Sequence, residues 1–294
     1  MDATSIFNSC DIVTSDTKKQ SFRATSKMLR ISSVWRIRQI ECTKQFKKCK
    51  HFTTVFVILL GSEREHISEV MIMRKNLTEI VFILDRSGSM SGLEADTIGG
   101  YNSLLEKQKK EDGEAIVSTV FFDDKQEVLH DRVSLDKMKP MTDKEYYVRG
   151  CTALLDAVGG AIHHIGNVHK YAREEDRPEK TLFIITTDGM ENSSCRYTYD
   201  KVKKMVEHQK EKYGWEFLFL GANIDAIEVA GRFGIGADRA VNYECDAVGT
   251  AVNYKALSKA VSRVRKSAEC PSMALGEDWK EEIEADYMMR HREN

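Results

Sequence analysis

Hydrophobic residues in this chain gather into short runs that alternate with segments of helical spacing. The strand-like runs after residue 75 are Glu79–Leu84, Glu114–Phe122, Gln126–Leu135, Lys180–Thr187, Glu216–Leu220 and Ala240–Tyr243. Apolar positions at helical spacing predict helices at Ala95–Lys110, directly after Thr152, and at Tyr199–Glu211, Ile224–Phe233 and Ala247–Arg265. Short, nearly continuous apolar runs are typical of strands that are buried on both faces. The alternation therefore predicts an α/β fold, with a doubly wound, mainly parallel sheet and helices on both faces.

The distribution of charge divides the chain into three segments. Residues 1–75 hold 14 Lys and Arg against 7 Asp and Glu, whereas residues 76–294 hold 30 against 39. No amphipathic period persists through residues 1–75, so we expect a basic, poorly ordered extension or a product of upstream translation, with Met71 or Met73 as the natural start. Residues 76–266 are the predicted domain. Residues 267–294 are a charged tail in which Trp279 and Ile283 fall at helical spacing, and we expect it to fold back on the domain or fray.

Composition narrows the class of protein further. The seven cysteines are scattered without a CxxC pair, which indicates neither a disulfide framework nor a structural zinc site and favours a cytoplasmic location. The longest apolar run, Val55–Leu60, is far shorter than the roughly 20 residues of a membrane helix, so no membrane association is expected. The basic residues of the first segment are spread out and form no stripe with aromatics, so no nucleic-acid partner is expected.

Two of the buried runs lead directly into acidic residues. Asp85, Ser87 and Ser89 follow Glu79–Leu84 at alternate positions, and Asp188 follows Lys180–Thr187. In a doubly wound sheet both segments lie at the carboxyl edge, where ligands bind. Oxygen ligands without His or Cys suit a hard cation such as Mg²⁺. For the Asp85–Ser89 segment alone, a helix N-cap is an equally good interpretation, because Ser and Asp satisfy the free backbone donors of a helix.

The combined pattern resembles the metal-ion-dependent adhesion site (MIDAS) of the von Willebrand factor A family. The motif positions are Asp85, Ser87, Ser89, Thr152 in GCTALLDA and Asp188 in TTDGMEN, present in the family's order within residues 76–266. The resemblance implies a Rossmann-like, six-stranded sheet with one short antiparallel edge strand and a Mg²⁺ or Mn²⁺ ion at its upper rim. It also implies that Ser87 and Ser89 bind the metal directly, Thr152 directly or through water, and the two aspartates mainly through water.

This resemblance leads to a functional expectation. We expect an intracellular protein of bacterial or phage type that binds a protein partner through a metal-bridged carboxylate, and that is not an enzyme. A metal-dependent hydrolase or phosphatase that uses the same Asp and Ser side chains is one alternative, and a structural domain with a stabilising metal is another. The chain lacks a second Asp at position 87 for a dehalogenase-type phosphotransferase, a Gly-x-Ser-x-Gly elbow, a Walker A sequence and a dinucleotide fingerprint in the right context.

Several residues near the motif have ordinary structural interpretations. Asp123 and Asp124 follow another strand and are expected in a solvated turn, with a supporting role at the metal as the alternative. Cys151 is expected to be a small buried apolar residue. His163 and His164 lack a metal-ligand spacing and are expected on the surface of the helix that follows Thr152.

Overall fold

The structure is a computed structural model that describes residues 74–291 of the 294-residue chain. The expectations for the basic extension at residues 1–75 concern, apart from its last two positions, residues outside this range. The same holds for the last three residues of the tail.

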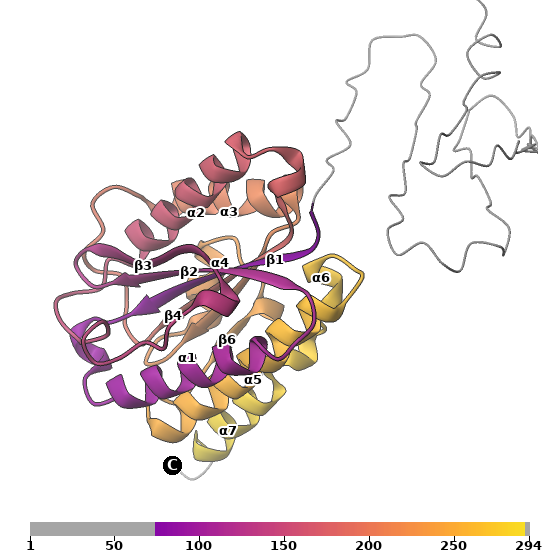
Figure 1. Cartoon of the computed structure of the whole chain (residues 1–294). Coiled ribbons are helices and arrows are strands. Elements are labelled where there is room, and N and C mark those ends of the chain that lie inside the picture. The colour runs from indigo at the N-terminus through magenta and orange to yellow at the C-terminus, as the bar shows by residue number, and fades with distance from the viewer. Residues whose placement is uncertain (1–73, 292–294) are drawn as a thin grey trace, which may run out of the picture. The chain divides into compact units, whose positions relative to one another are not determined.

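The described chain forms one six-stranded sheet in the order β3-β2-β1-β4-β5-β6 (Figure 1). The strands are β1 (Arg74–Asp85), β2 (Glu114–Phe122), β3 (Gln126–Ser134), β4 (Pro178–Thr187), β5 (Glu216–Gly221) and β6 (Ala240–Asn242). All neighbouring pairs are parallel except β2 and β3. The predicted fold class is confirmed. The antiparallel edge strand has nine residues, so it is longer than the short edge strand that the resemblance implies.

Helices cover both faces of the sheet (Figure 1). One layer contains α1 (Glu94–Gln108), α5 (Ala247–Lys266), α6 (Pro271–Ala274) and α7 (Glu281–His291), and the other contains α2 (Leu154–Tyr171), α3 (Tyr199–Tyr213) and α4 (Ala226–Arg232). Short 3-10 helices are η1 (Gly88–Met90), η2 (Leu135–Lys137), η3 (Glu174–Asp176), η4 (Ala237–Arg239) and η5 (Glu277–Lys280). Within residues 74–291, no helix has both the length and the apolar character needed to span a membrane.

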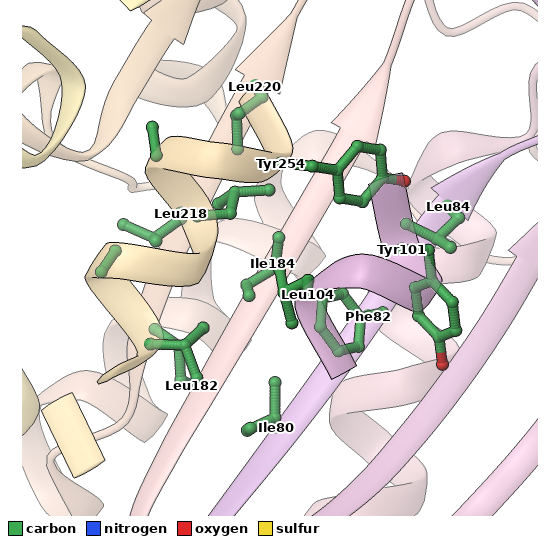
Figure 2. Close-up of a cluster of buried hydrophobic side chains, with 14 of the residues drawn as sticks. Ile80, Phe82, Leu84, Tyr101, Leu104, Leu182, Ile184, Leu218, Leu220 and Tyr254 are labelled. Atoms are coloured by element: carbon green, nitrogen blue, oxygen red, sulfur yellow. The ribbon is translucent and has the colours of Figure 1, made fainter. Parts of the chain in front are cut away.

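The central strands contribute alternate side chains to two hydrophobic cores. Ile80, Phe82 and Leu84 of β1 face the layer of α1 and α5, where they pack with the residues that Figure 2 shows. Val81 and Ile83 face α2, α3 and α4 on the other side. Both sets are fully buried, as the period of two along a strand requires when helices cover each face. This double burial explains why the stretch Ile80–Leu84 of β1 is apolar without interruption.

Helix α1 contains two adjacent glycines with opposite surroundings. A Cβ atom at Gly99 would have open space around it, whereas one at Gly100 would lie 2.2 Å from Cδ2 of Tyr254 on α5. We expect Gly99→Ala to raise the free energy of unfolding by about 0.5–1 kcal/mol, because alanine costs less backbone entropy in a helix. Gly100→Ala should lower it, because the two helices would have to separate. Urea denaturation of both variants checks this, and equal effects of the two substitutions would contradict the packing of α1 on α5.

The segment after α5 lies against the domain. Trp279 is buried and its indole Nε1 donates a hydrogen bond to the Asp238 carbonyl oxygen at 2.9 Å. Ile283 of α7 joins the core on the side of α5. The Arg263 guanidinium on α5 also donates two hydrogen bonds to the Asp278 carboxylate, with distances of 2.7 and 2.9 Å. Apolar burial and ion pairs therefore hold this segment along α5.

Candidate metal centre

The carboxyl ends of β1 and β4 bring the two predicted acidic ligands to the same edge of the sheet, called the rim below. The two strands are adjacent and parallel, with Leu84 opposite Thr186. Asp85 is the last residue of β1 and is fully buried, and Asp188 comes directly after β4 with 2 % of its surface exposed. The Thr187 hydroxyl donates to Asp85 Oδ2 at 2.6 Å, so the end of one strand is bonded to the end of the other.

The loop after β1 folds the two serines over this edge. The backbone N–H of Ser87 donates to Asp85 Oδ1 at 2.7 Å, and η1 then turns the chain at Gly88–Met90. The Ser87 and Ser89 hydroxyl oxygens lie 3.1 Å apart, and Ser89 donates to Asp188 Oδ1 at 2.6 Å. Neither η1 nor α1 has a side-chain cap at its N-terminus. The N-cap interpretation of this segment is therefore wrong: the Ser87 hydroxyl contacts Ser89 instead, and the Ser89 hydroxyl contacts Asp188.

Thr152 reaches the rim from the loop that precedes α2. Its side chain is buried, and its backbone pairs with Asn192, which accepts from the Thr152 N–H at 2.9 Å and donates to the Thr152 carbonyl at 3.1 Å. A Cβ atom on Gly189 would lie 3.2 Å from Thr152 Oγ1 and 3.4 Å from Ser89 Oγ, so the missing side chain leaves room for both hydroxyls. The structure thus places all five predicted site residues at one place on the rim.

The two carboxylates of this site have no cationic partner within residues 74–291. Among the described residues, neither Asp85 nor Asp188 forms an ion pair with a Lys, Arg or His side chain. The pKa of Asp85 is raised to about 6, mainly by burial; the nearby Asp188 adds to this rise, and the hydrogen bonds from Thr187 and Ser87 oppose it. Burial likewise raises the pKa of Asp188. A divalent cation would offset this repulsion, and the oxygen-only donors fit a hard ion.

Hydroxyl ligands are essential to such a site. Within residues 74–291, no group of three or more His, Cys, Asp or Glu side chains is arranged to hold a metal ion. A cation at this rim would therefore be held by Ser87, Ser89 and Thr152 together with the two aspartates. The residues present fit Mg²⁺ or Mn²⁺, which take hydroxyl, carboxylate and water oxygens.

A buried ion-pair network connects the loops of the candidate metal centre. It includes Asp123, for which the sequence analysis predicted a solvated turn. Asp123 is fully buried, not in a solvated turn, and its Oδ2 accepts hydrogen bonds from Arg86 Nε and Arg149 Nε, both at 2.8 Å. Arg86 is also fully buried and pairs with Glu127 at 2.6 Å. The Arg149 N–H donates to the Arg86 carbonyl at 2.9 Å. Asp123 therefore ties the loop that carries the serines to the loop that leads to Thr152.

Other residues near the site include some whose predicted positions the structure tests and two that the sequence analysis did not predict. Cys151 is exposed, not buried, because the chain at the rim turns Thr152 inward instead. The surface position expected for His163 and His164 is confirmed. The Cys245 thiol lies 3.7 Å from Asp188 Oδ2, and Asn223 Nδ2 lies 3.4 Å from the Asp188 carbonyl oxygen. No motif signals these two residues, although Asn223 has a φ of 55°, which is uncommon outside glycine.

The described fold is similar to several solved structures. No family model matches the sequence, and no curated protein matches it. Proximal thread matrix protein 1 (PTMP1) from the mussel byssus is 15 % identical, with a TM-score of 0.43 over 63 % of this chain and 46 % of that one. Another crystal structure of PTMP1 has a zinc-occupied MIDAS motif. The vWF domain of the pilus tip protein Mfa5 from Porphyromonas gingivalis is 10 % identical, with a TM-score of 0.47 over 68 % of this chain and 98 % of that one.

This chain spans about half the length of the PTMP1 chain, and the identities are low, so the function of the site rests on its own geometry. The strand order and the antiparallel edge strand define a doubly wound α/β domain, and the five predicted site residues lie together at its rim. The described chain has a six-stranded, mostly parallel α/β fold, and the solved structures to which it is similar include a vWF domain.

Proposed function

We propose that this domain is a metal-dependent protein-binding module. Mg²⁺ or Mn²⁺ is held at the rim by Ser87, Ser89, Thr152, Asp85 and Asp188, and an acidic residue of a partner protein binds the cation. One observation carries the proposal: the Ser89 hydroxyl lies 2.6 Å from Asp188 and 3.1 Å from the Ser87 hydroxyl, beside two buried carboxylates without a basic partner among the described residues.

The chemistry of the ligands supports a bridging role for the cation. Three of the five proposed metal-binding side chains are neutral hydroxyls, which withdraw little positive charge from a bound cation. Mg²⁺ in proteins usually retains exchangeable waters, so a partner carboxylate can replace one of them. The strongest ligand for the remaining position is an anionic oxygen, and the acidic side chains Asp and Glu supply it.

A binding role also fits the hydrogen bonds of the serines better than hydrolysis does. A serine nucleophile needs an adjacent base, and His fills that role most often. In the described structure the two hydroxyls contact each other, Ser89 also contacts Asp188, and no His side chain lies within hydrogen-bonding distance of them. We therefore propose a binding protein and not an enzyme, and the scattered cysteines support a cytoplasmic location for it.

Metal titration of the full chain tests this proposal. We expect Mg²⁺ to raise the free energy of unfolding by about 2.7 kcal/mol at a hundredfold excess over its Kd. The double variant Ser87→Ala/Ser89→Ala should lose affinity for Mg²⁺ by about tenfold or more, because two oxygen ligands disappear. Isothermal titration calorimetry and thermal melting measure both effects. Ser103→Ala, an exposed serine on α1, is the matched control and should titrate like the wild type.

The outcome of the titration separates the alternatives. Unchanged titration curves for the double variant would refute the metal centre. Binding of Mg²⁺ together with metal-dependent, Asp85-dependent hydrolysis of phosphate esters would favour the enzyme. Stabilisation by Mg²⁺ without any protein retained from a lysate in Mg²⁺ and released by EDTA would favour a purely structural metal.

A further inference from the structure

The loops and helix starts at the carboxyl ends of the strands carry exposed hydrophobic side chains. Nine large hydrophobic residues are exposed in the described part of the chain. Four of them, here called the rim patch, lie in loops or first helical turns near the carboxyl ends of the strands: Tyr147 (43 % exposed), Met190 (65 %), Ile227 (43 %) and Val248 (57 %). Clusters of exposed apolar residues with a polar surround are typical of interaction sites.

Two members of the rim patch are directly linked to the site loops. Met190 is two residues after Asp188 and follows Gly189, where an added Cβ atom would lie 3.2 Å from Thr152 Oγ1 and 3.4 Å from Ser89 Oγ. The ring of Tyr147 has its centroid 5.3 Å from the Arg86 guanidinium, and Arg86 is the residue between Asp85 and Ser87. These two side chains therefore flank the centre from the loops after β4 and before α2.

The other two members begin the helices that follow β5 and β6. Ile227 lies in the first turn of α4, after the loop in which Asn223 reaches the Asp188 carbonyl oxygen. Val248 lies in the first turn of α5, three residues after Cys245, whose thiol approaches the Asp188 carboxylate. Each of the four residues is thus within five positions of a group that contacts the centre.

Tyr147 is held in place before any partner arrives. The Arg149 guanidinium also lies 5.3 Å from the centroid of its ring, and Arg149 Nη1 donates to the Tyr147 hydroxyl at 3.1 Å. An aromatic side chain that is held by contacts with two guanidinium groups loses little conformational entropy on binding. Such Tyr residues often contribute much of the binding energy at protein interfaces.

The charges around the rim restrict the chemistry of the partner. The bound cation calls for one carboxylate. Arg86 and Arg149 are already paired with Asp123 and Glu127, so they leave little positive charge for further acidic groups. A segment with many acidic residues therefore does not match this surface. An acidic residue with apolar neighbours does.

We propose that the rim patch is the docking surface around the metal, and that it binds a protein segment in which the metal-binding Asp or Glu is flanked on both sides by aromatic or aliphatic residues. This inference rests on the function proposed above. It adds the class of partner: the cation binds the carboxylate, while Tyr147 and Met190 contact the side chains next to it.

A displayed peptide library tests the inference. The library has a fixed central Asp or Glu with random residues on both sides, and it is sorted against the full chain in Mg²⁺ and again in EDTA. We expect the metal-dependent binders to carry aromatic or aliphatic residues beside the acid. Their affinity should fall about tenfold or more with Tyr147→Ser or Met190→Ser, the size typical of an interface hot spot. Mg²⁺ affinity without peptide should stay unchanged in both variants.

Matched controls are Tyr171→Ser and Met273→Ser. These residues are 79 % and 70 % exposed, and they lie at or after the far ends of α2 and α5, away from the rim. Both controls should bind the selected peptides like the wild type. Metal-dependent peptides without an apolar preference, or with equal affinity for all four variants, would overturn this inference and leave the proposed function intact. An absence of any metal-dependent binder would overturn both the inference and the proposed function. A metal-dependent dimer in light scattering would overturn the inference as well, because a second copy of the chain would then occupy the rim patch.

Discussion

Replacement of Asp123 by alanine is expected to lower the free energy of unfolding by about 3–5 kcal/mol. The Asp123 carboxylate is fully buried and accepts hydrogen bonds from Arg86 and Arg149, each at 2.8 Å, and from the Lys125 N–H at 2.9 Å. Burial works to raise the pKa of Asp123, but these hydrogen bonds outweigh it and hold the pKa below its ordinary value. The substitution leaves the fully buried Arg86 without its central counter-charge, which is the costly way to break a buried pair.

Chemical denaturation of the full chain measures this effect. Asp143→Ala, at an exposed position in the loop before Thr152, is the control and should change the free energy of unfolding by less than about 0.5 kcal/mol. A loss of Mg²⁺ affinity should accompany the Asp123 substitution although Asp123 is not a proposed ligand, because Arg86 and Arg149 connect the two loops of the centre. Equal stability of Asp123→Ala and Asp143→Ala would mean that the network contributes nothing to folding.

Asp85→Asn is expected to raise the free energy of unfolding without metal and to lower it, relative to the wild type, when Mg²⁺ is bound. Burial raises the pKa of Asp85 from 3.8 to about 6, a difference that corresponds to about 3 kcal/mol between the ionised and protonated forms. The neutral amide removes this cost, so near neutral pH the metal-free variant should be more stable than the wild type by up to about 3 kcal/mol. In Mg²⁺ the order should reverse, because the variant has lost a carboxylate that the cation needs.

The pH dependence of this effect has a definite sign. The folded protein binds the Asp85 proton more tightly than the unfolded chain does, so this residue makes the metal-free wild type lose stability as the pH rises from about 4 to about 6. Mg²⁺ must displace the same proton, so the stabilisation by Mg²⁺ should grow through pH 6 and then level off.

Thermal melting in Mg²⁺ and in EDTA, over a series of pH values, measures both parts of this prediction. Asp143→Asn removes one exposed carboxylate and should follow the wild type at every pH. A metal-free Asp85→Asn variant that melts below the wild type at neutral pH would show that the hydrogen bonds of the Asp85 carboxylate outweigh its repulsion. An unchanged response to Mg²⁺ in this variant would exclude Asp85 from the metal centre.

The sequence by itself determined the layers of this protein and the edge of the sheet on which the candidate site lies. Strand segments that are buried on both faces are nearly continuous apolar runs, so β1 and β4 are visible in the sequence through Ile80–Leu84 and Leu182–Ile185. Asp85 and Asp188 end those runs. Parallel strands bring their carboxyl ends to one edge, so the convergence of the two aspartates follows from position along the chain.

Only the tertiary structure decided the order of the strands, the surroundings of the ligands and the role of Asp123. Nothing in the local pattern states that β4 joins β1 on the side opposite to β2, or that Cys245, 57 residues after Asp188, returns to its carboxylate. An Asp in a polar stretch after a strand usually faces water, and Asp123 is buried because Arg86 and Arg149 come from two other loops to meet it. Contacts between distant segments leave no periodic trace in the sequence, so the network that holds the centre together becomes visible only in the folded chain.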